Sequence, residues 1–302
     1  MVMDSRATEQ SVDAVEGIDT WGSVEILNSL VAGQERAIAA VRDAVPYIAS
    51  AADILATRLA AGGRLAYAGA GTSIRIAVQD GSELPATFGM AENKLLYFIA
   101  GGRAAMFETL ADAEDDAEAG RRDAALLEPT DTLIAIAASG RTPYTIAAAE
   151  FAKSKGVFII SVVNNSDTAL GALGNIAIVL NSGAEVIAGS TRMGAGTAQK
   201  AALNLLSTLA HIRLGAVHDG LMVNVHPDNL KLKQRAIDII SKISNVNVEQ
   251  AAQSLHQSHG QVKSAVLLCS GAKNLTFAQK LLESTKGNLR LALAQLNQDE
   301  RN

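Results

Sequence analysis

The stretch AYAGAGTSIRIAVQDGSELPATFG, residues 66–89, carries the pattern on which the predicted fold rests. A short apolar run ends in glycines and hydroxyl residues, and a helical pattern follows. Short apolar strands that each lead through a turn into a helix are typical of a parallel sheet covered on both faces. One glutamate, Glu83, follows, and most of its neighbours in the sequence are uncharged. The stretch therefore predicts a sheet edge suited to a ligand, and it raises the question of what the glutamate does.

The same alternation of strand and helix continues along the chain. Four further apolar runs have the length of strands: residues 94–101, 131–139, 157–163 and 175–181. Helical patterns separate most of them, for example at residues 143–155 and 191–214. Residues 23–60 are also helical in pattern, and Pro46 within them predicts two helices or one kinked helix. We therefore expect an α/β fold, a doubly wound parallel sheet of about five strands with N-terminal helices.

The strand-like runs mostly stop after residue 240. Residues 248–296 are expected to form three short helices, with Gly260, Gly271 and Gly287 near the helix ends. The run SAVLLCS, residues 264–270, would also suit a buried strand, but a helix is favoured because a three-helix unit closes on itself. The expected domains are therefore residues 1–240, which hold the sheet and the binding site, and a small helical domain at 241–302.

Composition argues against several classes of protein. The net charge is -5 and no basic block stands out, so no nucleic-acid partner is expected. Cys269 is the only cysteine, which excludes an intramolecular disulfide and a cysteine metal cluster. No stretch is apolar enough to span a membrane, and the N-terminus has no run of signal-peptide type. We expect a cytoplasmic protein without a membrane partner.

Two turns at strand ends carry candidate phosphate-binding residues: Gly71, Thr72 and Ser73 in the first, and Ser139, Gly140, Arg141 and Thr142 in the second. Ligands bind at the carboxyl ends of parallel strands, and helix N-termini offer free N–H groups to phosphate. Each turn alone is equally well explained as an ordinary capped turn, but two in one sheet favour phosphate. Neither matches the Walker pattern or a full dinucleotide fingerprint, so no nucleotide cofactor is expected.

A third segment, residues 189–200, opens a long helix and offers a further wall for the pocket. Its candidate binding residues are Ser190, Thr191 and Lys200. The alternative for this segment is a capped helix with solvated charges.

Two glutamates are candidates for acid–base chemistry. The surroundings of Glu83 are short of charge, so burial would favour its protonated form, although a helix-end carboxylate is the simpler interpretation. Glu114 lies in the acidic segment LADAEDDAEAG, residues 110–120, and from the residues alone it is best explained as one carboxylate on a solvated face. The five histidines have no metal-ligand spacing, so no metal site is expected.

Several segments together resemble the N-acetylmuramic acid 6-phosphate etherases, a family of the sugar isomerase (SIS) fold superfamily. They are TEQ (8–10), GGRLAYAGAGTSIR (62–75), DGSELPATFG (80–89), IAASGRTPY (136–144), GSTRMGAGTAQK (189–200), LNLLSTLAHIRLG (203–215) and GLMVNV (220–225). The combination of GAGTS, SGRTPY and GTAQK in one chain is specific, and the helical tail fits the small C-terminal domain of these etherases.

The resemblance implies an enzyme, a carbon–oxygen lyase of cell-wall sugar recycling. Such etherases remove D-lactate from the C3 ether of N-acetylmuramic acid 6-phosphate by elimination and hydration, without metal or other cofactor. The turns would then hold a phosphate that does not react. By the same resemblance, Glu83 is the proton donor to the leaving oxygen and Glu114 is the second catalytic glutamate, the expected C2 base.

A homodimer is also expected, because SIS proteins commonly pair and the helical residues 23–60 and 198–214 are rich in apolar side chains. Departures from the family's usual pattern are Ile74 for Gly, Leu84 and Ala86 in SELPATFG, and Gly194 for Lys. Two alternatives remain, a sugar-phosphate isomerase of the same fold and a non-catalytic sugar-phosphate sensor that resembles the glucokinase regulatory protein. Retention of both glutamates favours the etherase.

Overall fold

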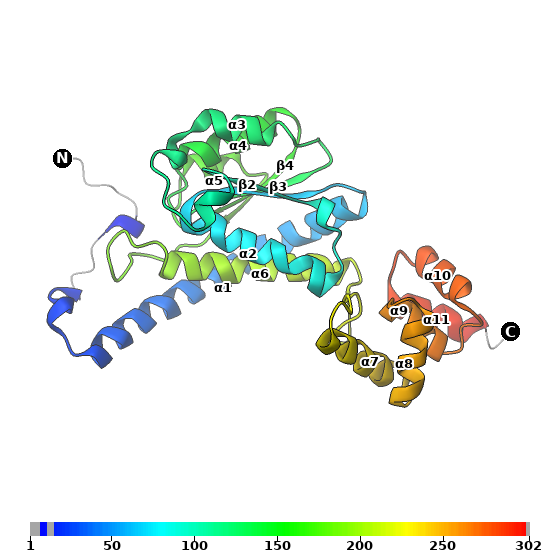
Figure 1. The fold of residues 1–302 in the computed structure, drawn as a ribbon. Helices are drawn as coiled ribbons and strands as arrows, with labels where there is room; N and C mark the ends of the chain where they lie inside the picture. The colour runs from blue at the N-terminus through cyan, green and yellow to red at the C-terminus, as the bar shows by residue number, and fades with distance from the viewer. Residues whose placement is uncertain (1–6, 11–14, 300–302) are drawn as a thin grey trace. The chain divides into compact units, whose positions relative to one another are not determined.

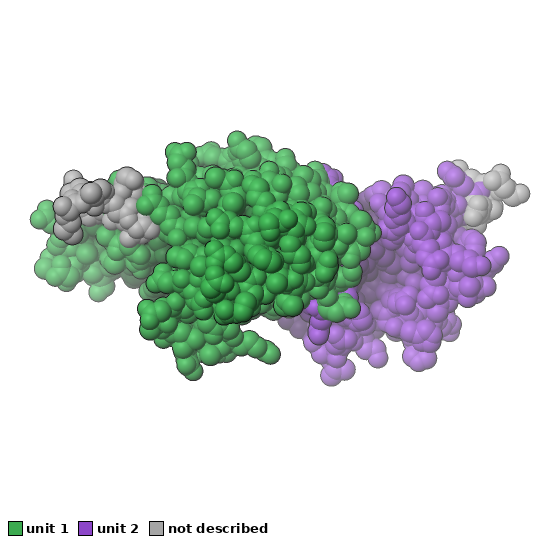
Figure 2. Space-filling model, turned by 90° about the horizontal axis from the view of Figure 1, so that it is seen from above, with its two compact units in different colours: residues 1–82, 93–207 green, residues 83–92, 208–302 purple. Residues whose placement is uncertain are grey.

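The computed structural model describes residues 7–10 and 15–299, which fold into two compact units (Figures 1 and 2). Unit 1 comprises residues 1–82 and 93–207, and unit 2 comprises residues 83–92 and 208–302. Unit 1 contains the parallel sheet, and unit 2 is mainly helical.

The five predicted strands form one parallel sheet in the order β2-β1-β3-β4-β5. Their bounds are Leu65–Gly69 for β1, Leu95–Ile99 for β2, Thr132–Ala137 for β3, Phe158–Val163 for β4 and Ile176–Val179 for β5. Every residue of the central strands β1 and β3 is buried, because helices cover both faces of the sheet. The strand order reverses between β1 and β3, which is where ligands bind in such sheets. The predicted doubly wound fold is confirmed.

The helices of unit 1 lie on both faces of the sheet (Figure 1), with α3, α4 and α5 on one face and α1, α2 and α6 on the other. Their bounds are Ser23–Ala60 for α1, Gly71–Phe88 for α2, Ala117–Ala124 for α3, Pro143–Ser154 for α4, Ala169–Leu173 for α5 and Gly194–Arg213 for α6. The alternative of two helices at residues 23–60 was wrong, since α1 continues through Pro46. Ala37, Ala44 and Ala51 of α1 are almost fully buried, and this packing outweighs the one hydrogen bond that proline removes.

Besides the last residues of α2 and α6, the described part of unit 2 contains a short antiparallel pair, β6 (Val217–His218) and β7 (Leu221–Met222), and five helices of its own. The helices are α7 (Leu230–Ser244), α8 (Val248–Gln257), α9 (Val262–Cys269), α10 (Leu275–Ser284) and α11 (Leu289–Asp299). The predicted helix at SAVLLCS is therefore confirmed as α9. Across the described part of the chain, no helix is both long enough and apolar enough to cross a bilayer.

The tail after residue 247 forms four helices, so the prediction of three was wrong. Gly260, Gly271 and Gly287 follow helix ends and have positive φ angles, as helix-ending glycines do. The missed helix is α11, which begins after Gly287. Its N-terminal signal is Asn288, whose side-chain Oδ1 accepts a hydrogen bond from the Leu291 N–H.

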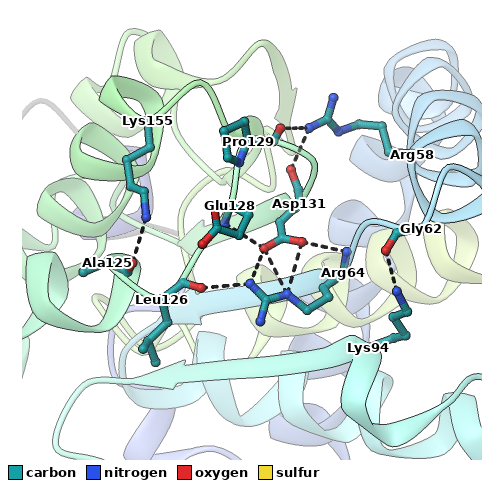
Figure 3. Close-up of polar contacts among 10 residues, drawn as sticks. All are labelled: Arg58, Gly62, Arg64, Lys94, Ala125, Leu126, Glu128, Pro129, Asp131 and Lys155. Carbon is teal, nitrogen blue, oxygen red and sulfur yellow. Dashed lines mark hydrogen bonds and ion pairs between the residues drawn. The ribbon is translucent and has the colours of Figure 1, made fainter.

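A cluster of polar contacts lies at the edge of the sheet where β1 and β3 begin, opposite the edge formed by the carboxyl ends of the strands (Figure 3). The Asp131 carboxylate, only 2% exposed, accepts hydrogen bonds from the Arg64 side chain, with Nη2 2.6 Å from Oδ2, and from the Arg64 N–H. It also accepts from the Glu128 N–H at 2.9 Å. Burial alone would raise the pKa of Asp131, but these hydrogen bonds outweigh burial and lower the pKa below its usual value.

Asp131→Asn is expected to destabilise the protein at neutral pH by about 1–3 kcal/mol, because the variant weakens the bonds to Arg64. A carboxyl with a lowered folded-state pKa stabilises the protein above its unfolded pKa, and this contribution is lost as the pH falls through the folded pKa. The difference between wild type and variant should therefore shrink below about pH 4. Urea unfolding across this pH range measures it, and a constant difference would contradict the assignment.

Candidate active site

A cavity of about 500 Å³ opens at the carboxyl ends of β1 and β3, where the strand order reverses. Apart from Gly71, the lining residues that matter for binding are polar. The set is Gly71, Thr72, Ser73, Arg75, Glu108, Thr109, Glu114, Ser139, Thr142 and Thr191. They come from the start of α2, the loop after β2, the turn between β3 and α4, and the segment before α6. The structure thus brings the three predicted phosphate-binding segments to one cavity.

The first turn places the N-terminus of α2 in the cavity wall. Gly71 has a positive φ of +53°, which L side chains rarely adopt, and it begins the helix directly after β1. The first N–H groups of a helix have no partner within the helix, and they carry partial positive charge. Together with the hydroxyls of Thr72 and Ser73, they form a site suited to a phosphate group.

The second turn contributes Ser139 and Thr142 to the cavity, but Gly140 and Arg141 do not line it. Gly140 has a φ of +64°, and a Cβ there would lie 2.4 Å from Cβ of Thr168, so this position needs glycine. The Arg141 N–H donates to Oγ of Ser139 at 3.2 Å. Gly140 and Arg141 therefore shape the turn, whereas Ser139 and Thr142 present hydroxyls at its surface.

Thr142 is the N-cap residue of α4, and its side chain makes no capping hydrogen bond in the described structure. The Thr142 hydroxyl is therefore not engaged in capping α4. Pro143 occupies the first turn of α4, where its missing N–H costs no hydrogen bond.

The third segment contributes Thr191 but not Ser190. The N-terminus of α6 already holds an anion, because the buried Glu185 carboxylate accepts from the N–H groups of Gly194 and Ala195 at 2.9 and 2.8 Å. A Cβ on Gly194 would lie 3.1 Å from Oε2 of Glu185. Glycine at this position, where the family usually has lysine, therefore leaves room for the carboxylate.

Lys200 does not line the cavity. It lies further along α6, and its Nζ donates to Oδ1 of Asn204. The structure therefore separates Lys200 from the hydroxyl-bearing turns with which the sequence analysis grouped it.

Glu114 reaches the cavity because the loop after β2 folds back on itself. Gly101 has a φ of +83°, and a Cβ there would lie 2.9 Å from Cδ1 of Leu110 and 3.2 Å from Cβ of Ala113. This tight return carries Glu114 to the start of α2, where its Oε1 lies 3.0 Å from the position of a Cβ on Gly71. Glu114 is therefore a carboxylate in the cavity wall and not merely one of the solvated charges of an acidic segment.

Arg75 also lines the cavity, and sequence reasoning did not select it. Its Nη2 donates to the carbonyl oxygens of Ala105 and Glu108 at 2.8 and 3.1 Å, so it ties the loop after β2 to α2. The available signal was its position as the one basic residue of α2, one turn after Gly71.

Glu83 does not line the cavity. It lies twelve residues after Gly71 in the same helix, which corresponds to about 18 Å along the helix axis. Glu83 is therefore about three helical turns along α2 from the helix start that lines the cavity.

Ile74, where the family usually has glycine, does not narrow the cavity. Its side chain is 1% exposed, and it lies under the first turn, 3.3 Å from the position of a Cβ on Gly69.

Among residues 7–10 and 15–299, no three His, Cys, Asp or Glu side chains are grouped as metal ligands.

Two family descriptions match the chain. Residues 47–153 match the glucokinase regulatory protein N-terminal SIS domain, and residues 104–209 match the SIS domain. Among solved structures, a phosphoheptose isomerase from Francisella tularensis is 24% identical, with a TM-score of 0.49 over 64% of this chain and 98% of that chain.

Similar proteins of known name cover nearly the whole chain. An N-acetylmuramic acid 6-phosphate etherase of Symbiobacterium thermophilum is 43% identical over 268 residues, which are 88% of this chain and 89% of that protein. N-acetylmuramic acid 6-phosphate etherase 1 of Bacillus licheniformis is 39% identical over 294 residues, 97% of each protein.

Proposed function

The chain belongs to the N-acetylmuramic acid 6-phosphate etherase family, and we propose that it cleaves the lactyl ether of this substrate. The products are N-acetylglucosamine 6-phosphate and D-lactate, so the protein is a carbon–oxygen lyase. The observation that carries the proposal is that the Glu114 carboxylate, next to Gly71 at the start of α2, shares a single cavity with three hydroxyl-bearing segments.

The phosphate of the substrate is held by the N-terminus of α2 and the hydroxyls around it. The proposed ligands are Gly71, Thr72, Ser73, Ser139, Thr142 and Thr191. Gly140 and Arg141 support the second turn, as their contacts indicate. The phosphate takes no part in bond breaking, so its binding energy serves to place the reacting carbons against the catalytic groups.

The reaction takes place at C2 and C3 of the sugar, the carbons that the bound phosphate positions. Glu114 removes the C2 proton of the open-chain sugar, which the C1 aldehyde acidifies, and the electron pair expels the lactyl oxygen from C3. Glu83 donates a proton to that oxygen, so D-lactate leaves and a C2–C3 double bond forms. Water then adds across the double bond, with its oxygen at C3, and N-acetylglucosamine 6-phosphate results. Two glutamates divide the acid and base roles, and no cofactor is needed for these steps.

The proton donor comes from a second copy of the chain. Glu83 is about 18 Å along α2 from the phosphate site of its own chain, so Glu83 of the partner subunit completes each site. A surface for that partner is present on α1. Val24, Val31, Ile38 and Val45 are 72%, 53%, 47% and 46% exposed. They are spaced by seven residues, the spacing of a helix-pairing stripe.

The remaining assignments concern the place of the reaction. A sugar phosphate is charged and does not pass freely through a bilayer, so we place the enzyme in the cytoplasm and the reaction in the recycling of cell-wall sugars. Residues 1–240 are assigned the binding and catalytic groups, and residues 241–302 a small helical domain.

The test of this function is the incubation of the protein with N-acetylmuramic acid 6-phosphate. D-lactate and N-acetylglucosamine 6-phosphate should appear in equal amounts. An isomerase would convert an aldose phosphate to a ketose phosphate without lactate, and a sensor would bind the sugar phosphate without turnover. Either result would replace the proposed function.

Ser73→Ala and Ser139→Ala are expected to raise KM roughly 10- to 100-fold, because each removes a hydroxyl donor worth about 1.5–3 kcal/mol to a charged phosphate. The kcat should change little if the phosphate is bound equally in the ground and transition states. The matched control is Ser154→Ala, at the other end of α4, where the hydroxyl donates to the Phe151 carbonyl. Steady-state kinetics measures both constants, and an unchanged KM in both variants would place the phosphate elsewhere.

A further inference from the structure

Asp80 is a buried carboxylate in the middle of α2, only 2% exposed. Its Oδ2 accepts from the Tyr67 hydroxyl at 2.9 Å. Its Oδ1 accepts from Nδ2 of Asn204 at 2.6 Å and from Oγ of Ser207 at 3.0 Å. These three donors carry no charge, and they come from β1 and from α6. Asp80 therefore joins α2 to the strand before it and to the long helix beside it.

The same network includes a lysine. Nζ of Lys200 donates to Oδ1 of Asn204, and the amide of Asn204 donates onward to the Asp80 carboxylate. Only one orientation of this amide satisfies both neighbours, because Lys200 is a donor and the carboxylate is an acceptor. The positive charge of Lys200 is thus linked to the buried negative charge of Asp80 through a single side chain.

A carboxylate suits this position better than a neutral side chain of the same shape. An ionised aspartate accepts several hydrogen bonds, whereas an asparagine would bring two donors of its own toward Asn204. Burial of a charge without a direct counter-charge is costly, so packing alone does not account for an aspartate here. Burial, and then the Asp80 charge, raise the pKa of Tyr67 well above its ordinary value, so this hydroxyl remains a donor.

The elements that Asp80 joins are the ones whose ends line the cavity. β1 leads into the turn at Gly71, and α6 follows Thr191. Near these ends the two helices approach each other closely, since a Cβ on Gly196 of α6 would lie 3.5 Å from Cγ2 of Thr72. Asp80, two turns further along α2, provides the second point at which α2 and α6 are tied. Two such points fix the position of one helix along the other.

We propose that Asp80 is a positioning residue of the phosphate site, which holds α2 and α6 in register so that Ser73 and Thr191 reach the same phosphate. This inference rests on the proposed function only in taking a sugar phosphate as the ligand. Asp80 touches no reacting atom, and it acts through the two helices.

Asp80→Asn is expected to raise KM, and the Kd for N-acetylglucosamine 6-phosphate and for inorganic phosphate, about tenfold or more. The matched control is Asp131→Asn, the same chemical change at a buried carboxylate on the opposite edge of the sheet. It should lower the melting temperature and leave KM and both Kd values unchanged. Kinetics, calorimetric titration and thermal unfolding of the full-length protein provide these measurements.

A charge exchange tests the network directly. In Asp80→Asn/Asn204→Asp, the carboxylate moves to position 204, where it accepts from residue 80 and pairs with Lys200. This double variant should return KM and Kd to within about threefold of wild type. Tyr67→Phe removes one donor without moving a charge, so it should fold and raise both Kd values measurably, which provides a readout if Asp80→Asn does not fold.

The outcomes separate the proposal from its alternatives. If Asp80→Asn lowers the melting temperature but leaves both Kd values unchanged, Asp80 is a structural residue and the proposal fails. A double variant that folds and still binds phosphate as weakly as the single variant also overturns it. The Kd values do not depend on turnover, so a wild-type protein that binds the sugar phosphate without releasing D-lactate removes the proposed reaction and leaves this inference testable.

Discussion

Glu114→Gln should stop both the release of D-lactate and the exchange of the C2 hydrogen with solvent. An acid–base group typically contributes about 10²- to 10⁴-fold to the rate, so kcat should fall by this factor while sugar-phosphate binding survives. The reason is the position of the carboxylate, in the cavity wall and against Gly71 at the start of α2. Glutamine keeps the size of the side chain and removes the base.

The measurement uses two readouts on the same sample. NMR in D₂O follows the C2 signal of the sugar, and a coupled assay follows lactate. The control is Glu118→Gln, a neighbouring glutamate that is exposed on α3 and pairs with Arg121, and it should leave both rates unchanged. If C2 exchange continues in Glu114→Gln while lactate release stops, the base and acid roles are reversed between the two glutamates.

Glu83→Gln should block lactate release to a similar extent and leave C2 exchange running. The aldehyde still stabilises the carbanion after Glu114 removes the C2 proton, but the lactyl oxygen no longer receives a proton as it leaves. A fall of about 10²- to 10⁴-fold in lactate release is expected from the loss of a general acid. The same NMR and lactate assays measure the two steps separately.

The position of Glu83 along α2 leads to a sharper test, in which the two inactive variants are mixed. A dimer with one Glu83→Gln chain and one Glu114→Gln chain contains one site with both glutamates if Glu83 comes from the partner subunit. Random exchange of equal amounts should then restore about a quarter of wild-type activity, since half the dimers are mixed and each has one intact site. The variants must be unfolded and refolded together, or co-expressed, so that the chains exchange.

Mixed dimers without activity would mean that both glutamates act within one chain. Sedimentation at micromolar concentration supplies the control for assembly, because a mass of one 31.4 kDa chain would leave no partner to donate Glu83. A dimeric mass together with restored activity supports a site completed by two chains.

Much of the fold was predictable from local patterns. The strands of the sheet are short and almost entirely apolar, since strands such as β1 and β3 are buried on both faces. The two errors arose where a local rule met a stronger effect. Pro46 does not end α1, because the alanines of that helix are packed against the rest of the unit. The last helix, α11, was missed because its cap at Asn288 directly follows Gly287.

The site was predictable only in part. The turns at Gly71 and Ser139 could be placed because the carboxyl ends of parallel strands meet at one edge of a sheet. Glu114 could not, since its acidic segment has the pattern of a solvated surface, and only the tight return at Gly101 carries it into the cavity. The sequence also does not reveal that Lys200 turns toward Asn204, because that contact depends on the side chain's conformation on α6.

The contact between Gly71 and Glu114 bears on how such a protein diverges. A single β-carbon at position 71 would lie 3.0 Å from Oε1 of Glu114, in a backbone conformation that L side chains rarely adopt. The hydroxyl groups proposed to hold the phosphate all come from other positions and would remain. A single substitution at this glycine is therefore expected to displace the proposed base while most of the groups proposed to bind the phosphate stay in place, which would leave a protein that recognises its ligand and turns it over poorly.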